Sequence, residues 1–229
     1  VTGSMSQGQN RNPPSQIEVE HKMLAAPKPK NESERLAALR ALQILDTPSE
    51  ERFDRITELA QQICHVPIAY IALIDSDRQW FKSKCGLTTD ETGRDISFCG
   101  HAINQDDPLI IPDTLEDDRF ADNPLVTEDP KIRFYAGFPL SGPGGYNVGT
   151  LCIADNSPRE TSNIDPKAML LLANMAKHEL NMVDVIRTQK ELIDAKSMLI
   201  RTQQRQTSEL AEAAKYARSL IPDAITEGP

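Results

Sequence analysis

The pattern of apolar and polar residues divides the chain into three parts with different periodicities. Residues 1–30 show no periodic pattern, residues 31–180 mix helical spacing with short apolar segments, and residues 181–221 repeat every seven positions. The first part combines several prolines with Gln, Asn, Ser and Lys, and Val1–Met5 has the composition of a cloning remnant. Because such a segment cannot bury enough apolar surface to offset its chain entropy, we expect residues 1–30 to form a disordered leader.

Two helices are expected at the start of the second part. The segment Asn31–Glu34 has the residue order of a capping box and precedes leucines at helical spacing. The segment Thr47–Glu50 places Thr at the N-cap, Pro at the first helical position and Glu at the third. An apolar stripe follows from Phe53 to Ile63, so this second segment predicts a helix that starts at Pro48.

Strand character appears in five later segments. Ile68–Ile74 is almost continuously apolar, and residues 79–85 alternate after a polar turn, so these two segments predict a hairpin. The other three segments are Leu109–Ile111, Arg133–Leu140 and Val148–Ile153. Residues 86–105 and 113–130 have the character of loops. This combination of helices and strands predicts an α+β domain over residues 31–180.

A single long helix is expected after this domain. Asp165 and Pro166 supply an N-cap and a first-position proline, and no proline or glycine follows until Pro222. Apolar pairs then recur every seven residues, which is typical of a coiled coil. We expect residues 181–221 to form a coiled coil and residues 222–229 to begin a linker to an output domain.

The heptad pattern fits two registers. One register has position a at Met182, Gln189, Lys196 and Gln203. It places Val185, Leu192 and Leu199 at position d, whereas the other register uses the neighbouring isoleucines, and both accept Leu210. Polar residues at consecutive a positions favour two strands over larger bundles, so we expect a parallel homodimer. The expected interface comprises Met182, Val185, Ile186, Gln189, Leu192, Ile193, Lys196, Leu199, Ile200, Gln203 and Leu210.

Charge and composition narrow the class of partner. The net charge of −9 and the isoelectric point of about 5.0 argue against a nucleic-acid partner and against anionic membrane surfaces. No apolar run approaches the roughly 20 residues that span a bilayer, and no signal-peptide pattern is present. We therefore expect a cytoplasmic protein whose four cysteines are reduced thiols.

Few residues carry the pattern of a reactive site. Cys99 and His101 are close in sequence, but a nucleophilic cysteine also needs a third, orienting group, which the pattern does not supply. Zinc ligands in two close pairs are absent, so we expect no catalytic residue, metal or cofactor. Aromatic walls with a few polar groups are typical of small-molecule pockets, although the same residues could form ordinary core. The candidate pocket residues are Trp80, Phe98, Cys99, His101, Phe120, Arg133, Phe134 and Tyr135.

The order of these segments resembles the bacterial GAF family. The matching segments are Ile44–Pro48, residues 74–82, Asp95–Cys99, Arg119–Val126, Arg133–Gly137 and Gly149–Cys152. The resemblance implies a central antiparallel sheet of about six strands, with helices on one face and a possible ligand pocket on the other. It also implies a sensor or dimerisation platform upstream of a kinase, cyclase or phosphatase. The motif of cyclic-nucleotide-binding members is absent, and Gly100 separates the Cys and His that are neighbours in bilin-binding members.

A second resemblance lies at the end of the chain. Tyr216–Pro222 is similar to the linker that precedes SpoIIE-like, metal-dependent serine/threonine phosphatase domains. We therefore expect a regulatory module that binds a small molecule or partner and signals through a dimeric coiled coil to a phosphatase. The alternatives are a scaffold without ligand, an input module of a diguanylate cyclase or histidine kinase, and a free methionine sulfoxide reductase that uses Cys85 and Cys99.

Overall fold

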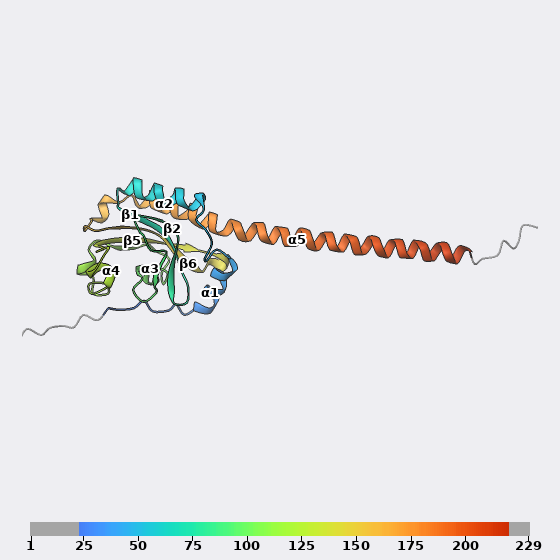
Figure 1. Cartoon of the computed structure of the whole chain (residues 1–229), viewed down its shortest axis with the longest axis horizontal. Coiled ribbons are helices and arrows are strands. Elements are labelled where there is room, and N and C mark those ends of the chain that lie inside the picture. The colour runs from blue at the N-terminus through green and yellow to red at the C-terminus, as the bar shows by residue number, and fades with distance from the viewer. Residues whose placement is uncertain (1–22, 220–229) are drawn as a thin grey trace, which may run out of the picture.

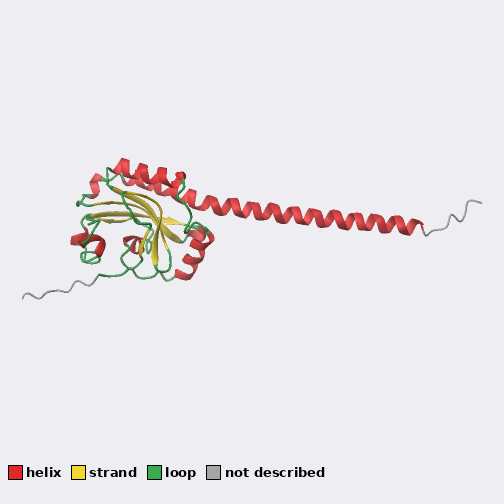
Figure 2. Ribbon diagram, in the orientation of Figure 1, coloured by secondary structure: helices red, strands yellow, loops and turns green. Residues whose placement is uncertain are grey.

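Six antiparallel strands form the centre of the domain. The computed structural model describes residues 23–219, except for the side chains of residues 163, 183–188 and 191. The strands are β1 (Ile68–Ile74), β2 (Arg78–Cys85), β3 (Glu91–Gly93), β4 (Leu109–Ile111), β5 (Phe134–Ser141) and β6 (Asn147–Asp155). Their order in the sheet is β3-β2-β1-β6-β5-β4, and Figure 2 shows the strands of this sheet in yellow. The predicted α+β class with a central six-stranded sheet is confirmed.

Helices cover the two faces of the sheet unequally. The helices are α1 (Glu32–Ala41), α2 (Glu51–Cys64), α3 (Phe98–Ala102), α4 (Pro124–Thr127) and α5 (Pro166–Ser219). The long α2 and the first turns of α5 lie side by side on one face, and the short α3 and α4 lie on the other (Figure 1). This division gives the domain one helix-covered face and one face covered by short helices and loops.

Alternation along β1 produces two separate hydrophobic cores. Ile71 and Leu73 are buried against the helices, with Met169 and Leu180 of α5 in the same core. Tyr70, Ala72 and Ile74 point to the other face, where α3 and the loops cover them. Because successive side chains of a strand point to opposite faces, a continuously apolar strand such as β1 has to be covered on both sides.

A β-bulge interrupts the alternation that was expected in β2. The register of the β1–β2 pair shifts between Ile71 and Ala72, so Ser83 turns to the helix-covered face together with Trp80. There Ser83 Oγ donates to Asp54 of α2 at 2.6 Å. The expected strict alternation of residues 79–85, which would put Ser83 and Trp80 on opposite faces, is therefore wrong, because the bulge adds one residue to β2 between them.

The second helix begins later than the sequence predicted. α2 starts at Glu51 rather than Pro48, and Thr47 does not cap it. Thr47 Oγ1 accepts a 2.8 Å hydrogen bond from Lys82 Nζ, and the carbonyl of Pro48 accepts a second at 2.7 Å. The Lys82 side chain is fully buried and also pairs with Glu50. These residues therefore satisfy a buried ammonium group instead of the helix terminus.

The end of the predicted leader contacts the domain. Residues 23–29 have no regular secondary structure, and their backbone contacts α3 and the turn that follows it. The carbonyl of Leu24 accepts a hydrogen bond from His101 at 2.9 Å, and the carbonyl of Pro27 accepts one from Asn104 at 3.0 Å. The expected boundary at residue 31 is therefore too late, while residues 1–22 lie outside the described part of the chain.

α5 is one continuous helix that leaves the domain (Figure 1). Asp165 Oδ1 accepts hydrogen bonds from the backbone of Lys167 and Ala168, which confirms the predicted N-cap. One side of the first turns is buried, including Met169, Leu172 and Leu180. The expected end of the helix at residue 221 and the linker at residues 222–229 lie outside the described residues. No helix within residues 23–219 is long and apolar enough to cross a membrane.

Candidate functional site

Five of the predicted pocket residues lie together on the face opposite α2 and α5. Ser97 caps α3 by accepting a hydrogen bond from Gly100, which fixes the short helix against the sheet. Phe98 then stacks between Phe120 and Tyr135, with ring centroids 4.4 and 5.0 Å apart. All three rings are at most 1% exposed. The aromatic cluster is therefore packed core rather than an open pocket wall.

The sulfur atoms of Cys99 and Cys152 lie next to the hydroxyl group of Tyr135, a member of this aromatic cluster. Their separation is 3.4 Å, and both residues are fully buried. The Tyr135 hydroxyl lies 3.4 Å from Cys99 Sγ and 3.2 Å from Cys152 Sγ, and the Tyr70 hydroxyl lies 3.8 Å from Cys99 Sγ. Two thiols and two phenols thus form one buried cluster that joins α3 to three central strands.

The environment shifts the pKa values of the two thiols in opposite directions. Burial alone raises the pKa of Cys99, but hydrogen bonds with Cys152, Thr150 and the two tyrosines lower it to about 7. Burial raises the pKa of Cys152 well above its ordinary value. Cys99 is therefore the more acidic thiol, and Cys152 remains protonated.

His101 binds the N-terminal segment rather than a cysteine. Its Nε2 donates to the carbonyl of Leu24 at 2.9 Å, and its ring meets Phe120 edge-on at 4.8 Å. Burial lowers the pKa of His101. Cys99 points to Cys152 instead, so the two residues do not form a nucleophile–base pair.

Three predicted pocket residues lie elsewhere. Phe134 and Trp80 belong to the helix-covered core, because they occupy strand positions whose side chains point to that face. Arg133 lies at the surface and forms a bidentate ion pair with Asp113, at 2.9 and 2.6 Å. The prediction that these three residues share a pocket with Phe98 and Tyr135 is wrong.

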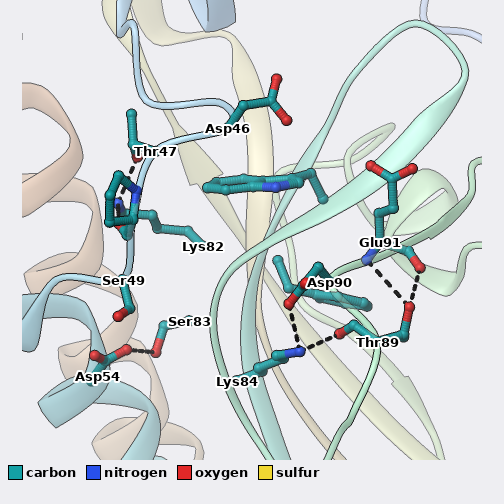
Figure 3. Close-up of a pocket in the computed structure, with 13 residues that line it drawn as sticks. Asp46, Thr47, Ser49, Asp54, Lys82, Ser83, Lys84, Thr89, Asp90 and Glu91 are labelled. Atoms are coloured by element: carbon teal, nitrogen blue, oxygen red, sulfur yellow. Dashed lines mark hydrogen bonds and ion pairs between the residues drawn. The ribbon is translucent and has the colours of Figure 1, made fainter.

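A broad polar groove of about 930 Å³ lies between the start of α2 and the β2–β3 hairpin (Figure 3). Trp80 lines it, and Lys82 and Lys84 are the cationic residues in its wall. Lys82 is neutralised by Glu50, and Lys84 by Asp90 at 2.8 Å. Because both cations already have carboxylate partners, the groove offers little to an anionic ligand.

A smaller cavity of about 310 Å³ opens on the other face, between β1, β2 and the loops that follow β2 and α4. Its lining residues are Tyr70, Gln79, Phe81, Gly86, Leu87, Thr88, Thr89, Thr92, Leu125, Asp129, Pro130 and Ile132. Apolar walls with a few hydroxyl, amide and carboxylate groups are typical of small-molecule sites, and this volume is at the lower end of their range. Among these described lining residues, none is Lys or Arg.

The sequence predicted none of the residues of this cavity. Its floor comes from the buried strands, but its rim depends on how the loop after β2 turns. Gly86 makes that turn with φ of +76°, and a Cβ atom there would collide with the Pro67 backbone. The sequence feature that could have indicated this cavity is Gly86, which is followed closely by the threonines Thr88, Thr89 and Thr92.

The geometry does not bring Cys85 and Cys99 together. Cys85 faces Thr57 of α2 at 3.8 Å, on the opposite side of the sheet from Cys99. The expected alternative of a reductase that uses these two cysteines together therefore lacks support. Within residues 23–219, no group of three or more His, Cys, Asp or Glu side chains is arranged to hold a metal ion.

Comparison with known proteins identifies the family. The model of the GAF domain matches residues 48–180, so the chain belongs to the GAF domain family. A cyclic di-GMP phosphodiesterase of Pseudomonas aeruginosa is 40% identical over 137 residues, which are 60% of this chain and 23% of that protein. The chain thus spans about a quarter of this relative's length.

Solved structures with a similar arrangement are more distant in sequence. The GAF domain of PixJ from Thermosynechococcus elongatus is 12% identical, with a TM-score of 0.49 over 70% of this chain and 95% of that one. The GAF domain of an Acinetobacter phosphoenolpyruvate-protein phosphotransferase is 15% identical, with a TM-score of 0.46 over 69% of this chain and 97% of that one.

Proposed function

We propose that this chain is a regulatory input module, in which a small molecule binds the GAF domain and α5 transmits the change to an output domain of the same polypeptide. The observation that carries the proposal is that α5 has two roles along its length. Met169, Leu172 and Leu180 pack on the domain core, whereas the later apolar residues Leu192 and Leu199 are exposed. A change in the domain can therefore alter the position of a helix whose remaining apolar face is available to a second copy.

The ligand is proposed to occupy the 310 Å³ cavity rather than the larger groove. Since Asp129 is the one charged residue in its lining, the cavity favours an uncharged or cationic molecule over a phosphorylated one. Such a ligand stabilises the folded domain by mass action. It shifts the module between two conformations only as far as its affinity for these conformations differs.

A thermal-shift experiment tests the ligand site. Leu87→Trp fills the cavity, and Leu115→Trp, at an exposed position outside its lining, is the matched control. A panel of neutral and cationic metabolites should contain a compound that raises the melting temperature of the wild type and of the control but not of the Leu87 variant. If no compound in the panel does so, the module is a dimerisation scaffold without ligand.

The first turns of α5 support one of the two coiled-coil registers for the proposed dimer. Counting back in sevens from Ile193 leads to residue 186, to Glu179 and to Leu172. Leu172 is buried in its own domain, and Glu179 pairs with Arg52 of α2 at 3.3 Å. The heptad positions of the isoleucines are therefore occupied by contacts within the domain at the start of α5, so they do not form a dimer seam there.

The heptad positions of the leucines are exposed wherever the structure describes their side chains. Counting back in sevens from Leu199 leads through Leu192, residue 185 and His178 to Leu171, which is 66% exposed. The adjoining column leads back from Gln189 to the half-exposed Met175. We therefore assign the seam of a parallel homodimer to the first register, with its beginning at Leu171 rather than Met182.

Two classes of output domain remain in the proposal. The similarity of Tyr216–Pro222 to a phosphatase linker favours a serine/threonine phosphatase, although part of this segment lies outside the described residues. The relative in Pseudomonas aeruginosa acts on cyclic di-GMP, which favours an enzyme of cyclic di-GMP turnover instead. Assays of the full-length polypeptide against a phosphoprotein and against cyclic di-GMP distinguish them.

A further inference from the structure

We propose that Cys99 and Cys152 form a reversible disulfide when the protein meets a hydroperoxide, which makes the pair a redox-sensitive modification site. The sulfur atoms lie 3.4 Å apart, although 53 residues separate them in sequence. A disulfide bond is about 2.05 Å long, so the two sulfurs have to approach by about 1.3 Å. Cys99 lies in the short α3, which can make this movement without breaking the sheet.

The groups around the pair favour the chemistry of a thiol and its resolving partner. The Tyr135 hydroxyl donates a hydrogen bond to Cys99 Sγ at 3.4 Å, which stabilises a thiolate there. The lowered pKa of Cys99, about 7, agrees with this geometry. Cys152 keeps its proton and donates to Thr150 Oγ1 at 3.0 Å. The pair therefore consists of one attacking sulfur and one protonated sulfur in contact with it.

The proposed entry point of the oxidant is the small cavity, which is the described cavity next to Tyr70. Tyr70 lines that cavity, and its hydroxyl lies 3.8 Å from Cys99 Sγ. One side chain thus separates the cavity from the thiols. Cys64 and Cys85 do not share this position, since they lie towards the helix-covered face.

The reaction balances with hydrogen peroxide as the oxidant. Cys99 Sγ attacks one peroxide oxygen, the O–O bond breaks, and the other oxygen leaves as water after it takes the thiol proton. Cys152 Sγ then attacks the sulfenic sulfur, the S–S bond forms, and the S–O bond breaks. The hydroxide takes the Cys152 proton and leaves as a second water. Two thiols lose two electrons, and the peroxide gains them.

The consequence of the disulfide is a covalent link between α3 and the central strand β6. β6 ends at Asp155, ten residues before the N-cap of α5 at Asp165. Oxidation would therefore fix the cavity face of the domain independently of any bound ligand. This inference does not depend on the ligand proposed above.

The test is peptide mapping of the folded whole chain after treatment with hydrogen peroxide. Free thiols are alkylated in denaturant, and the digest is searched for a Cys99–Cys152 cross-link with two hydrogens fewer than the separate peptides. The cross-link should be the main product, should disappear on treatment with dithiothreitol, and should persist in the Cys64→Ser/Cys85→Ser variant. Cys152→Ser and Cys152→Ala should each lose it and yield a sulfenic or sulfinic acid at Cys99.

Two results would overturn the inference. One is that Cys99 and Cys152 are both recovered as alkylated thiols from peroxide-treated wild-type protein. The other is that Cys99 is converted to a sulfinic acid in the wild type without a cross-link. Both results are measured on the wild-type protein. They therefore remain decisive even if a Cys152 variant fails to fold.

Discussion

The register of the proposed dimer leads to the sharpest prediction. Leu192 and Leu199 are 69% and 66% exposed in the single chain, which corresponds to about 120 Å² for each leucine. At about 25 cal/mol per Å², burial of each side chain contributes about 3 kcal/mol, and truncation to alanine removes about 1.5–2 kcal/mol of this. The Leu192→Ala/Leu199→Ala variant removes four leucines per dimer, or about 6–8 kcal/mol.

The expected result is a loss of affinity of about 10⁴-fold or more, because each 1.4 kcal/mol corresponds to a factor of ten. The matched control is Ile193→Ala/Ile200→Ala, which removes side chains of the same size that are 62% and 46% exposed. In the assigned register these isoleucines flank the seam, so the control should lose about tenfold or less.

Sedimentation equilibrium over a range of protein concentrations measures both dissociation constants, and circular dichroism checks that α5 stays helical. Alanine is a good helix former, so neither variant weakens the helix itself. If the isoleucine variant dissociates more readily than the leucine variant, the register assignment is wrong. If neither variant changes the dissociation constant, the helix is not the dimer interface.

Three further predictions concern the domain and the helix. Hydrogen bonds from two buried arginines hold the pKa of Glu32 at about 2, despite the opposing effect of burial. The ionised Glu32 side chain contributes about 2 kcal/mol to the free energy of unfolding above pH 4.5, and this contribution is lost as the pH falls towards 2. The Glu32→Gln variant should therefore be less stable to urea at pH 7, and its stability should decline less with acid than that of the wild type. An equal decline in both proteins would contradict this. Gly137→Ala should lower the free energy of unfolding by about 1–3 kcal/mol, because the new Cβ overlaps the Tyr135 hydroxyl. Thermal melting measures this loss, and a melting temperature equal to that of the wild type would exclude the overlap. Gln189→Ile with Gln203→Ile should tighten the dimer in sedimentation and hold a full-length enzyme in one state of activity, and a normally regulated enzyme would refute the role of the weak seam.

Local patterns in the sequence were sufficient for the main elements of the fold. β1 was predicted with its observed limits at Ile68 and Ile74, because a central strand buried on both faces is continuously apolar. The start of α5 was predicted from Asp165 and Pro166, whose roles depend only on the residues that follow them. In these cases the signal and the structure that it specifies lie within one short segment.

Elements that depend on distant partners were missed. β3 is three residues long, and Glu91–Gly93 becomes a strand only through its pairing with β2. The start of α2 was misplaced because Thr47 binds Lys82, a residue 35 positions later. Neither interaction leaves a local pattern in the sequence.

The pocket prediction failed for a reason that the sequence contained. Phe134 and Tyr135 are neighbours in one predicted strand, so their side chains had to point to opposite faces. Both residues were predicted to line the pocket because they are aromatic, whereas strand geometry allows at most one of them to face a given pocket. The cavity itself depends on the loop after β2, whose path is set by contacts of Gly86 with the backbone of Pro67.

The uninterrupted course of α5 has a mechanical consequence. Leu180 is the last buried residue among the described side chains of α5, and from there to Ser219 the helix extends for about 58 Å at 1.5 Å per residue. A tilt of about 5° at the domain therefore moves the far end by about 5 Å, close to the rise of one helical turn. A displacement of a few tenths of an ångström in the packing of Met169 and Leu172 is thus amplified by leverage alone, with no conformational change inside the helix.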